Sequence, residues 1–301
     1  MKRWVKRGAL ALAALVALGA ATFALGTQLG ERRMNRHIVL SVQPVALRSD
    51  AASVERGRYL YASRGCADCH GAGGAGRVVI DDGKGLRIKA PNISPGPGSV
   101  VARYRPEDWV LAIRHGVKPD GRPLLVMPSE EYNRLTDDDL AALVAYVRQL
   151  APAEGTAAVV QFPALVKTLY GFGAIPDAAE KIDHALPPST PVPEGVTVEH
   201  GRYVAAACIG CHGAGFAGGR IAGAPPDWPA AANLTPGEGS AMARYQSRDR
   251  FVAMLRSGRR PDGSAVSPVM PFAALQAMND TDAAALHLYL QSLPARPAGT
   301  H

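Results

Sequence analysis

The feature that most constrains this 301-residue chain is a five-residue motif that occurs twice and uses all four cysteines. Residues 66–70 (CADCH) and 208–212 (CIGCH) both follow the pattern C-x-x-C-H, the attachment signature of c-type haem. On a helical turn, cysteines three residues apart can each form a thioether with one haem vinyl group, and the following histidine is then held under the iron. The sequence therefore predicts two covalently bound haem c groups. The residues that would hold them are Cys66, Cys69 and His70 in the first motif, and Cys208, Cys211 and His212 in the second.

Three other uses of these cysteines stay open. A four-cysteine zinc site is one, although its cysteine pairs usually lie about 15–20 residues apart and these pairs lie 142 residues apart. A thioredoxin-like redox pair is another, although it would need a preceding strand and a βαβ setting that the sequence does not show. Two disulfides are the third, because an exported chain can form them.

The surroundings of the motif also recur, at offsets of 141 to 144 residues. The matching segments are 53–59 with 197–203, 92–96 with 233–237, 119–121 with 261–263, 127–128 with 270–271, and 135–150 with 278–293. Such self-similarity indicates an internal duplication of one unit of about 100 residues. We expect two tandem domains, at 49–152 and 193–296. A connecting segment at 153–192 and a short tail at 297–301 complete the chain.

Each domain is predicted to be all-α. In the last segment of the first unit, apolar residues recur at i, i+3, i+4, i+7 and i+10, as on the buried side of a helix. Thr136 and Asp139, or Asn279 and Asp282 in the second unit, take the N-cap and N3 positions of a capping box. Two-residue alternation is limited to a short run at 78–80, so strands are not expected.

A haem iron also needs a sixth ligand, and two methionines are the candidates. Met127 and Met270 are each followed by proline, in a loop between the haem motif and the final helix. A methionine is more often a flexible core residue, but the matching positions in the two halves favour a ligand role. We expect His70 to pair with Met127 and His212 with Met270. Histidine and methionine together saturate the iron and raise its potential, which suits an electron carrier.

The remaining histidines have no counterpart in the other half of the chain. They are His37, His115, His184, His200, His287 and His301. A ligand role at a duplicated site would require a duplicated histidine. We therefore expect these six to be solvated surface residues.

The net charge of +7 comes entirely from the first 48 residues, which hold eight basic side chains and one glutamate. The other 253 residues carry 25 basic and 25 acidic side chains. A neutral body has no cationic surface for a phosphate backbone, so nucleic acid is excluded as a partner.

The basic residues flank an apolar run at 8–29. Twenty-two residues at about 1.5 Å each make about 33 Å, enough to cross the hydrocarbon layer, whereas a cleaved signal usually has a shorter apolar core. We expect residues 1–30 to be a membrane anchor in the bacterial inner membrane, with 31–48 as a linker and the haem domains in the periplasm. If the segment is instead a cleaved signal, the protein would be soluble in the periplasm.

The connecting segment is not uniformly polar. It contains an apolar cluster at 162–172 that a flexible linker would not need. We expect this segment to pack against one or both haem domains and to restrict their relative motion. The alternative is a short helix on the surface.

Together, the haem motif, the loop at 92–96, the Pro-Asp-Gly segment at 119–121, Met127-Pro128 and the closing helix from Leu135 resemble class I cytochrome c domains. More narrowly, the set is similar to the multihaem cytochrome c subunits of membrane-bound alcohol, aldehyde and gluconate dehydrogenases. The resemblance covers roughly residues 50–296. It implies that the first helix crosses the last near Gly57 and Gly201. Those subunits usually carry three haem motifs, and this chain has two.

The resemblance implies a dihaem carrier of single electrons with no substrate chemistry of its own. Its expected partners are a membrane-bound or periplasmic dehydrogenase, or a quinol donor, and a respiratory acceptor such as a terminal oxidase. The alternative is a dihaem peroxidase or a thiosulfate-oxidising cytochrome. A peroxidase needs one haem iron with an open position, which paired methionine ligands would not leave.

Overall fold

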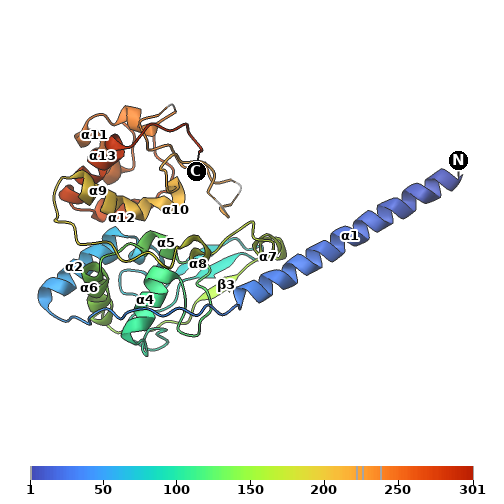
Figure 1. The fold of residues 1–301 in the computed structure, drawn as a ribbon, viewed down its shortest axis with the longest axis horizontal. Coiled ribbons are helices and arrows are strands. Elements are labelled where there is room, and N and C mark those ends of the chain that lie inside the picture. Colours follow the sequence, from blue (N-terminus) through green and yellow to red (C-terminus); the bar gives the residue numbers. More distant parts are fainter. Residues whose placement is uncertain (1, 222, 226, 238, 301) are drawn as a thin grey trace.

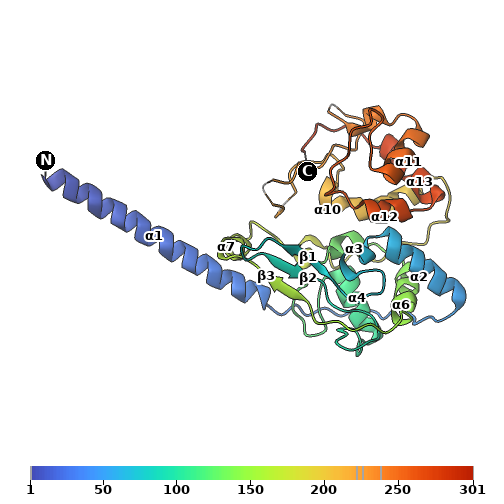
Figure 2. The same ribbon diagram turned by 180° about the vertical axis from the view of Figure 1, so that it is seen from behind.

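A computed structural model describes residues 2–221, 223–225, 227–237 and 239–300. The chain forms two helical bodies, one stacked on the other, and a long N-terminal helix that projects from the first of them (Figure 1). This helix, α1 (Lys2–Met34), is long and apolar enough to cross a membrane. Its first two-thirds are exposed on all sides (Figure 2).

The first domain is built around two helices that cross. Its helices are α2 (Ala51–Ser63), α3 (Cys66–His70), α4 (Pro106–His115), α5 (Ser129–Tyr132) and α6 (Asp137–Arg148). Gly57 of α2 lies so close to α6 that a β-carbon there would collide with the Ala142 carbonyl and the Tyr146 side chain. The expected apolar stripe of α6 is buried, and Leu140 and Val144 are fully enclosed. The implied crossing of the first and last helices is confirmed here.

The second domain has the same kind of core. Its helices are α9 (Val198–Ala205), η1 (Ala206–Cys208), α10 (Ile209–His212), η2 (Ala241–Arg244), α11 (Arg248–Ser257), α12 (Phe272–Ala277) and α13 (Asp280–Ser292). Gly201 of α9 meets the Ala285 carbonyl of α13, as Gly57 meets α6. Thr136 and Asn279 cap the last helices by accepting the backbone N–H of Asp139 and Asp282, as expected.

The all-α prediction is wrong for a small part of the first domain. Strands β1 (Val78–Asp81), β2 (Arg87–Lys89) and β3 (Val159–Gln161) form an antiparallel sheet in the order β1-β2-β3. Asp82 closes the turn between β1 and β2 by accepting the N–H groups of Lys84 and Leu86. The third strand comes from the connecting segment. Periodicity did not reveal the sheet because its strands are short and one pairing is long-range.

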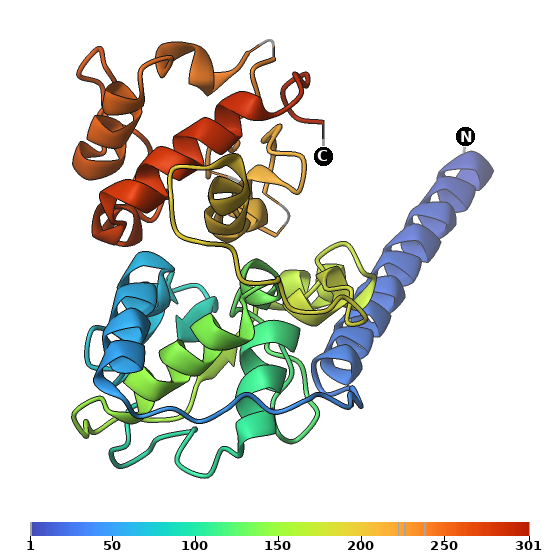
Figure 3. The same ribbon diagram turned by 60° about the vertical axis from the view of Figure 1, so that its left-hand side comes forward.

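The connecting segment packs partly as expected. It contributes β3 to the first domain, and its short helix α8 (Ala178–Lys181) lies against α5. Its other helix, α7 (Ala164–Gly171), packs against α1 rather than against a haem domain. Figure 3 shows α7 beside the lower end of α1.

Candidate haem sites

A cavity of about 460 Å³ lies inside the first domain, and Cys66, His70 and Met127 all line it. Its other walls are mainly apolar and include Leu60, Ile93, Trp109, Ile113, Leu143 and Val147. A mainly apolar hollow with a few polar groups is the usual form of a cofactor site. A thiol, an imidazole and a thioether on its wall fit a haem bound through Cys66, with His70 and Met127 as iron ligands.

Both histidines of the motifs are oriented by a backbone carbonyl. His70 Nδ1 lies 3.1 Å from the Pro91 carbonyl oxygen, and His212 Nδ1 lies 2.8 Å from that of Ala232. A ring whose Nδ1–H donates to a carbonyl keeps its Nε2 unprotonated and free to bind a metal. Burial also lowers the pKa of His70 and of His212, which favours the neutral ring.

The carbonyl that holds His70 sits on a loop fixed by a buried asparagine. Asn92 donates to the carbonyls of Pro97 and Ala153, and its own oxygen accepts from Ser94. This explains why the asparagine loop recurs in the sequence. Its side chain fixes the backbone next to the carbonyl that orients the histidine.

The second domain builds the corresponding loop in the same way. Asn233 donates to the Arg296 carbonyl, and its oxygen accepts from Thr235. Met270 and Cys208 pack against one apolar cluster that includes Leu275 and Met278. The structure thus brings Met270 and the start of the second motif to the same core, and the pairing of Met270 with His212 stays a prediction.

The geometry speaks against the other uses of the cysteines. All four are free thiols, and the motifs form helical turns in two different domains. Burial raises the pKa of Cys66 and of Cys208 to about 12, the opposite of the lowered pKa of a reactive redox pair. Among the described residues, no three His, Cys, Asp or Glu side chains cluster as a metal site would require.

Both motif helices lie at the interface between the domains. Helix α5, which follows Met127-Pro128, packs on η1 and α10. Helix α12, which follows Met270-Pro271, packs on α2 and α3. Glu131 of α5 lies directly against Gly210, inside the second motif. Burial, and then the neighbouring Glu130, raise the pKa of Glu131 to about 8. The motif helix of each domain is therefore in contact with a helix of the other domain.

Two tyrosines bind the domains together in a reciprocal way. The Tyr59 hydroxyl, from α2 of the first domain, donates to Asp282 Oδ2 at 2.6 Å and accepts the N–H of Asn279 at 3.2 Å. Asn279 and Asp282 are the N-cap and N3 residues of α13. In a capping box the N3 side chain would accept the N-cap N–H directly. Here the Tyr59 hydroxyl lies between the two groups and binds both.

Tyr203 makes the same contacts in the opposite direction. Its hydroxyl, from α9 of the second domain, donates to Asp139 Oδ2 at 2.6 Å and accepts the N–H of Thr136 at 3.3 Å. Each domain therefore caps the last helix of the other. We call Tyr59 and Tyr203, with the helix starts they bind, the tyrosine clasp.

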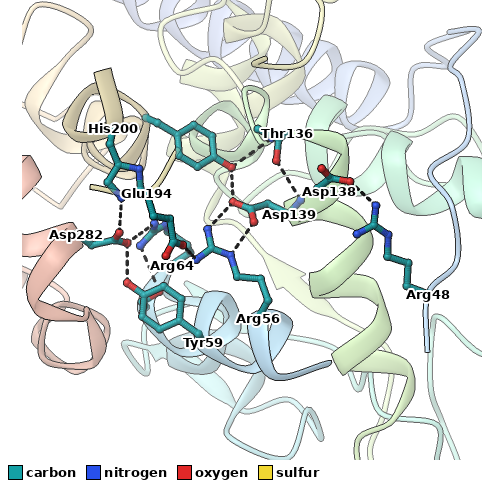
Figure 4. Close-up of polar contacts among 12 residues, drawn as sticks. Arg48, Arg56, Tyr59, Arg64, Thr136, Asp138, Asp139, Glu194, His200 and Asp282 are labelled. Atoms are coloured by element: carbon teal, nitrogen blue, oxygen red, sulfur yellow. Dashed lines mark hydrogen bonds and ion pairs between the residues drawn. The ribbon is translucent and has the colours of Figure 1, made fainter. Parts of the chain in front are cut away.

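At the centre of the interface, Asp282 is held by three side chains (Figure 4). Besides Tyr59, it accepts from Arg64 Nη2 at 2.8 Å, and its Oδ1 lies 2.7 Å from His200 Nε2. The side chains of Arg64 and Asp282 are only 5% and 1% exposed. Burial alone would raise the pKa of Asp282, but Arg64, Tyr59 and His200 outweigh it and hold that pKa below its ordinary value.

Its counterpart Asp139 is less enclosed. It pairs with Arg56 at 2.8 Å, and Arg56 also reaches Glu194 in the segment that leads to α9 (Figure 4). The Arg56 side chain is 25% exposed. The ion pair beside Tyr203 is therefore more exposed to solvent than the ion pair beside Tyr59.

The expectation of solvated histidines is wrong for three of the six. His200 is fully buried against Asp282, His287 is buried with Nε2 2.7 Å from the Tyr245 carbonyl, and His115 is buried beside His184. None of these three lines the cavity between His70 and Met127. His301 lies outside the described residues.

Comparisons with known proteins agree with this geometry. Residues 52–147 match the family described as cytochrome c oxidase, cbb3-type, subunit III, and residues 198–294 match the cytochrome c family. The chain is 28% identical over 276 residues to the fructose dehydrogenase cytochrome subunit of Gluconobacter japonicus, and 30% identical over 283 residues to the alcohol dehydrogenase (quinone) cytochrome c subunit of Gluconobacter oxydans. These matches cover 84% and 83% of this chain but only 55% and 57% of the relatives. The chain thus spans little more than half the length of these relatives.

Proposed function

This chain belongs to the cytochrome c family, and on that premise we propose that it is a membrane-attached dihaem carrier of single electrons. The observation that carries the proposal is the apolar cavity of the first domain, whose wall brings Cys66, His70 and Met127 together. The four thiols would attach the two haems. His70 with Met127, and His212 with Met270, would bind the irons.

When bound, haem c supplies one-electron exchange at its iron. The residues of this chain then decide what that iron can do. A histidine fixed by a backbone carbonyl and a methionine on the wall of the same cavity would fill the two free coordination positions of the iron, so that neither would be open to a substrate or peroxide. The apolar walls keep water away, which favours electron transfer with little rearrangement.

The tyrosine clasp supports transfer within the chain. It holds the two domains so that both motif helices lie at one interface. We infer that the two domains arose by duplication and exchange electrons across this interface. Two haems in a fixed arrangement would extend the distance over which one chain can carry an electron.

The donor is proposed from the relatives. The matched proteins are named as cytochrome subunits of fructose, alcohol and gluconate dehydrogenases, and we propose a membrane-bound dehydrogenase as the electron source. A terminal oxidase or another respiratory carrier would be the acceptor. With α1 as an anchor in the inner membrane, the domains would lie in the periplasm, close to both partners at high effective concentration.

The test uses the purified full-length holoprotein. Met127→Ala and Met270→Ala should each remove one methionine–iron bond, seen as loss of half of the weak long-wavelength band of the ferric protein. Met254→Ala, a matched change of a buried core methionine in α11, should keep the full band. Both haems should accept and release electrons without consuming any small substrate. Peroxide turnover by the unaltered protein, or an unchanged band in both ligand variants, would contradict the proposal.

A further inference from the structure

Helices α1 and α7 meet through small and hydroxyl-bearing residues. Gly26 and Gly30 of α1 lie so close to α7 that a β-carbon at either would collide with Thr168 or with the Lys167 carbonyl. The hydroxyls of Thr27 and Thr168 are 3.1 Å apart. Contacts of this kind, between small residues with a hydroxyl pair, are typical of helices that associate inside a membrane.

The other face of α7 has the reverse polarity of a helix on a water-soluble protein. Leu165 and Leu169 on this face, and the C-cap residue Phe172, are 61%, 39% and 51% exposed. They form one apolar stripe, whose Phe172 ring also contacts Gly26 at the edge of α1. Thr168 and Tyr170 are buried instead. An exposed apolar stripe with buried polar groups indicates an apolar surrounding on the exposed side.

The position of α7 along α1 indicates which surrounding this is. Its hydroxyl and close backbone contacts with α1 run from Phe23 to Gly30, at the end of the apolar run that finishes at Leu29. Its polar contacts continue beyond this run, to Glu31, Arg33 and Arg36. Phe23 and Gly30 are seven helical steps apart, and seven steps span about 10 Å, which is close to the depth of about 5–10 Å at which interfacial helices lie. The stripe is thus continuous with the exposed apolar surface of α1.

Two ion pairs then fix α1 to the start of α8 in the connecting segment, and α8 packs on α5 of the first domain. Arg36 binds Asp177 at 2.6 Å, and Arg33 binds Glu180 at 2.7 Å, both just beyond the apolar run. The Tyr170 hydroxyl also donates to Asp177. The charged groups therefore lie on the side of α7 that faces α1 and α8, whereas Leu165 and Leu169 lie on the exposed side.

We propose that α7 is a second membrane contact, with Leu165, Leu169 and Phe172 inserted in the outer leaflet of the bilayer beside α1. The inference rests on the proposed anchoring role of α1. Two contacts would fix the orientation of the haem domains above the membrane, which a single helix with a linker would not do.

The experiment uses the full-length holoprotein in vesicles that contain a phospholipid with a photoactivatable diazirine on its acyl chain. After illumination, lipid adducts are mapped by mass spectrometry. We expect adducts within 8–29 and within 164–172. The peptide around Leu186, an isolated exposed leucine in the same connecting segment, should carry none.

The outcomes separate the two claims. Adducts within 8–29 alone would overturn the role of α7 and leave the anchor intact, whereas adducts in neither segment would contradict the anchor itself. Adducts between two copies of the chain at 164–172 would assign the stripe to a dimer and overturn the inference. The double variant Leu165→Ser/Phe172→Ser should lose the α7 adducts only, with an unchanged haem spectrum, and Leu186→Ser should change nothing.

Discussion

Replacing Asp282 by asparagine should strongly destabilise the protein, because it removes the negative charge that compensates the buried guanidinium of Arg64. The two side chains have nearly the same size, so no cavity is created. Arg64 is only 5% exposed, and Asp282 is its only ion-pair partner among the described residues. Breaking a buried ion pair on one side costs about 3–5 kcal/mol, since the other charge stays buried and uncompensated.

Two matched variants calibrate this figure. Asp139→Asn removes the corresponding carboxylate, but Arg56 is 25% exposed and still has Glu194, so we expect about 1–2 kcal/mol. Asp280→Asn removes an exposed partner of Arg256, with Asp280 94% exposed, and should cost less than about 1 kcal/mol.

The assay is equilibrium unfolding of the full-length holoprotein in denaturant, followed through the haem absorbance and through far-UV circular dichroism. The free energy of unfolding should fall in the order Asp280→Asn, Asp139→Asn, Asp282→Asn, with the last the least stable. If Asp282→Asn costs no more than Asp139→Asn, the reasoning from burial is refuted.

The same variant has a defined pH dependence. The folded-state pKa of Asp282 lies below its ordinary value of 3.8. Its carboxylate therefore contributes stability in full above about pH 4, and that contribution is lost as the pH falls through the lowered pKa. The difference between the unaltered protein and Asp282→Asn should be constant near neutral pH and should shrink in acid. A difference that grows in acid would contradict the assignment.

Three further predictions concern the helix crossing and the interface. Gly57→Ala should cost about 1–3 kcal/mol in unfolding free energy, because the added methyl collides with α6, whereas Gly73→Ala, in open space, should not. Burial raises the folded-state pKa of Glu131 to about 8, so the unaltered protein should lose stability as the pH rises from about 4.5 to 8. Glu131→Gln should abolish this loss, and a loss that persists in the variant would refute the reasoning. Tyr59→Phe and Tyr203→Phe should each cost about 1–3 kcal/mol by leaving a buried carboxylate and a helix N–H without the hydroxyl. Equal amide exchange at both helix starts before and after these changes would contradict the clasp.

The helix crossings near Gly57 and Gly201 were expected from the resemblance to class I cytochrome c domains. The haem motifs could be predicted because they depend on local chemistry, and a C-x-x-C-H turn leaves a direct mark on the sequence. The capping residues Thr136 and Asn279 were predicted for the same reason, and both make the expected hydrogen bonds.

The interface could not be predicted because its contacts join residues far apart in the chain. Tyr59 and Asp282 are separated by 223 residues. The repetition of tyrosine and aspartate in both halves was visible, but it indicated equivalent positions and not which domain each tyrosine contacts. His200 was misjudged for the same reason, since its partner Asp282 lies 82 residues further along the chain. The third strand, β3, depends on pairing with β2 about 70 residues away, which no local pattern reveals.

The central claim, two haems that each carry histidine and methionine ligands, is tested most directly by one absorbance measurement. The ferric full-length protein is recorded in the long-wavelength region where sulfur bound to haem iron absorbs, and the intensity is normalised to covalent haem. We predict two covalent haems per chain, intensity for two methionine–iron bonds, and no carbon monoxide binding after reduction. Intensity for one bond or none, with carbon monoxide bound, would contradict the assignment of Met127 and Met270.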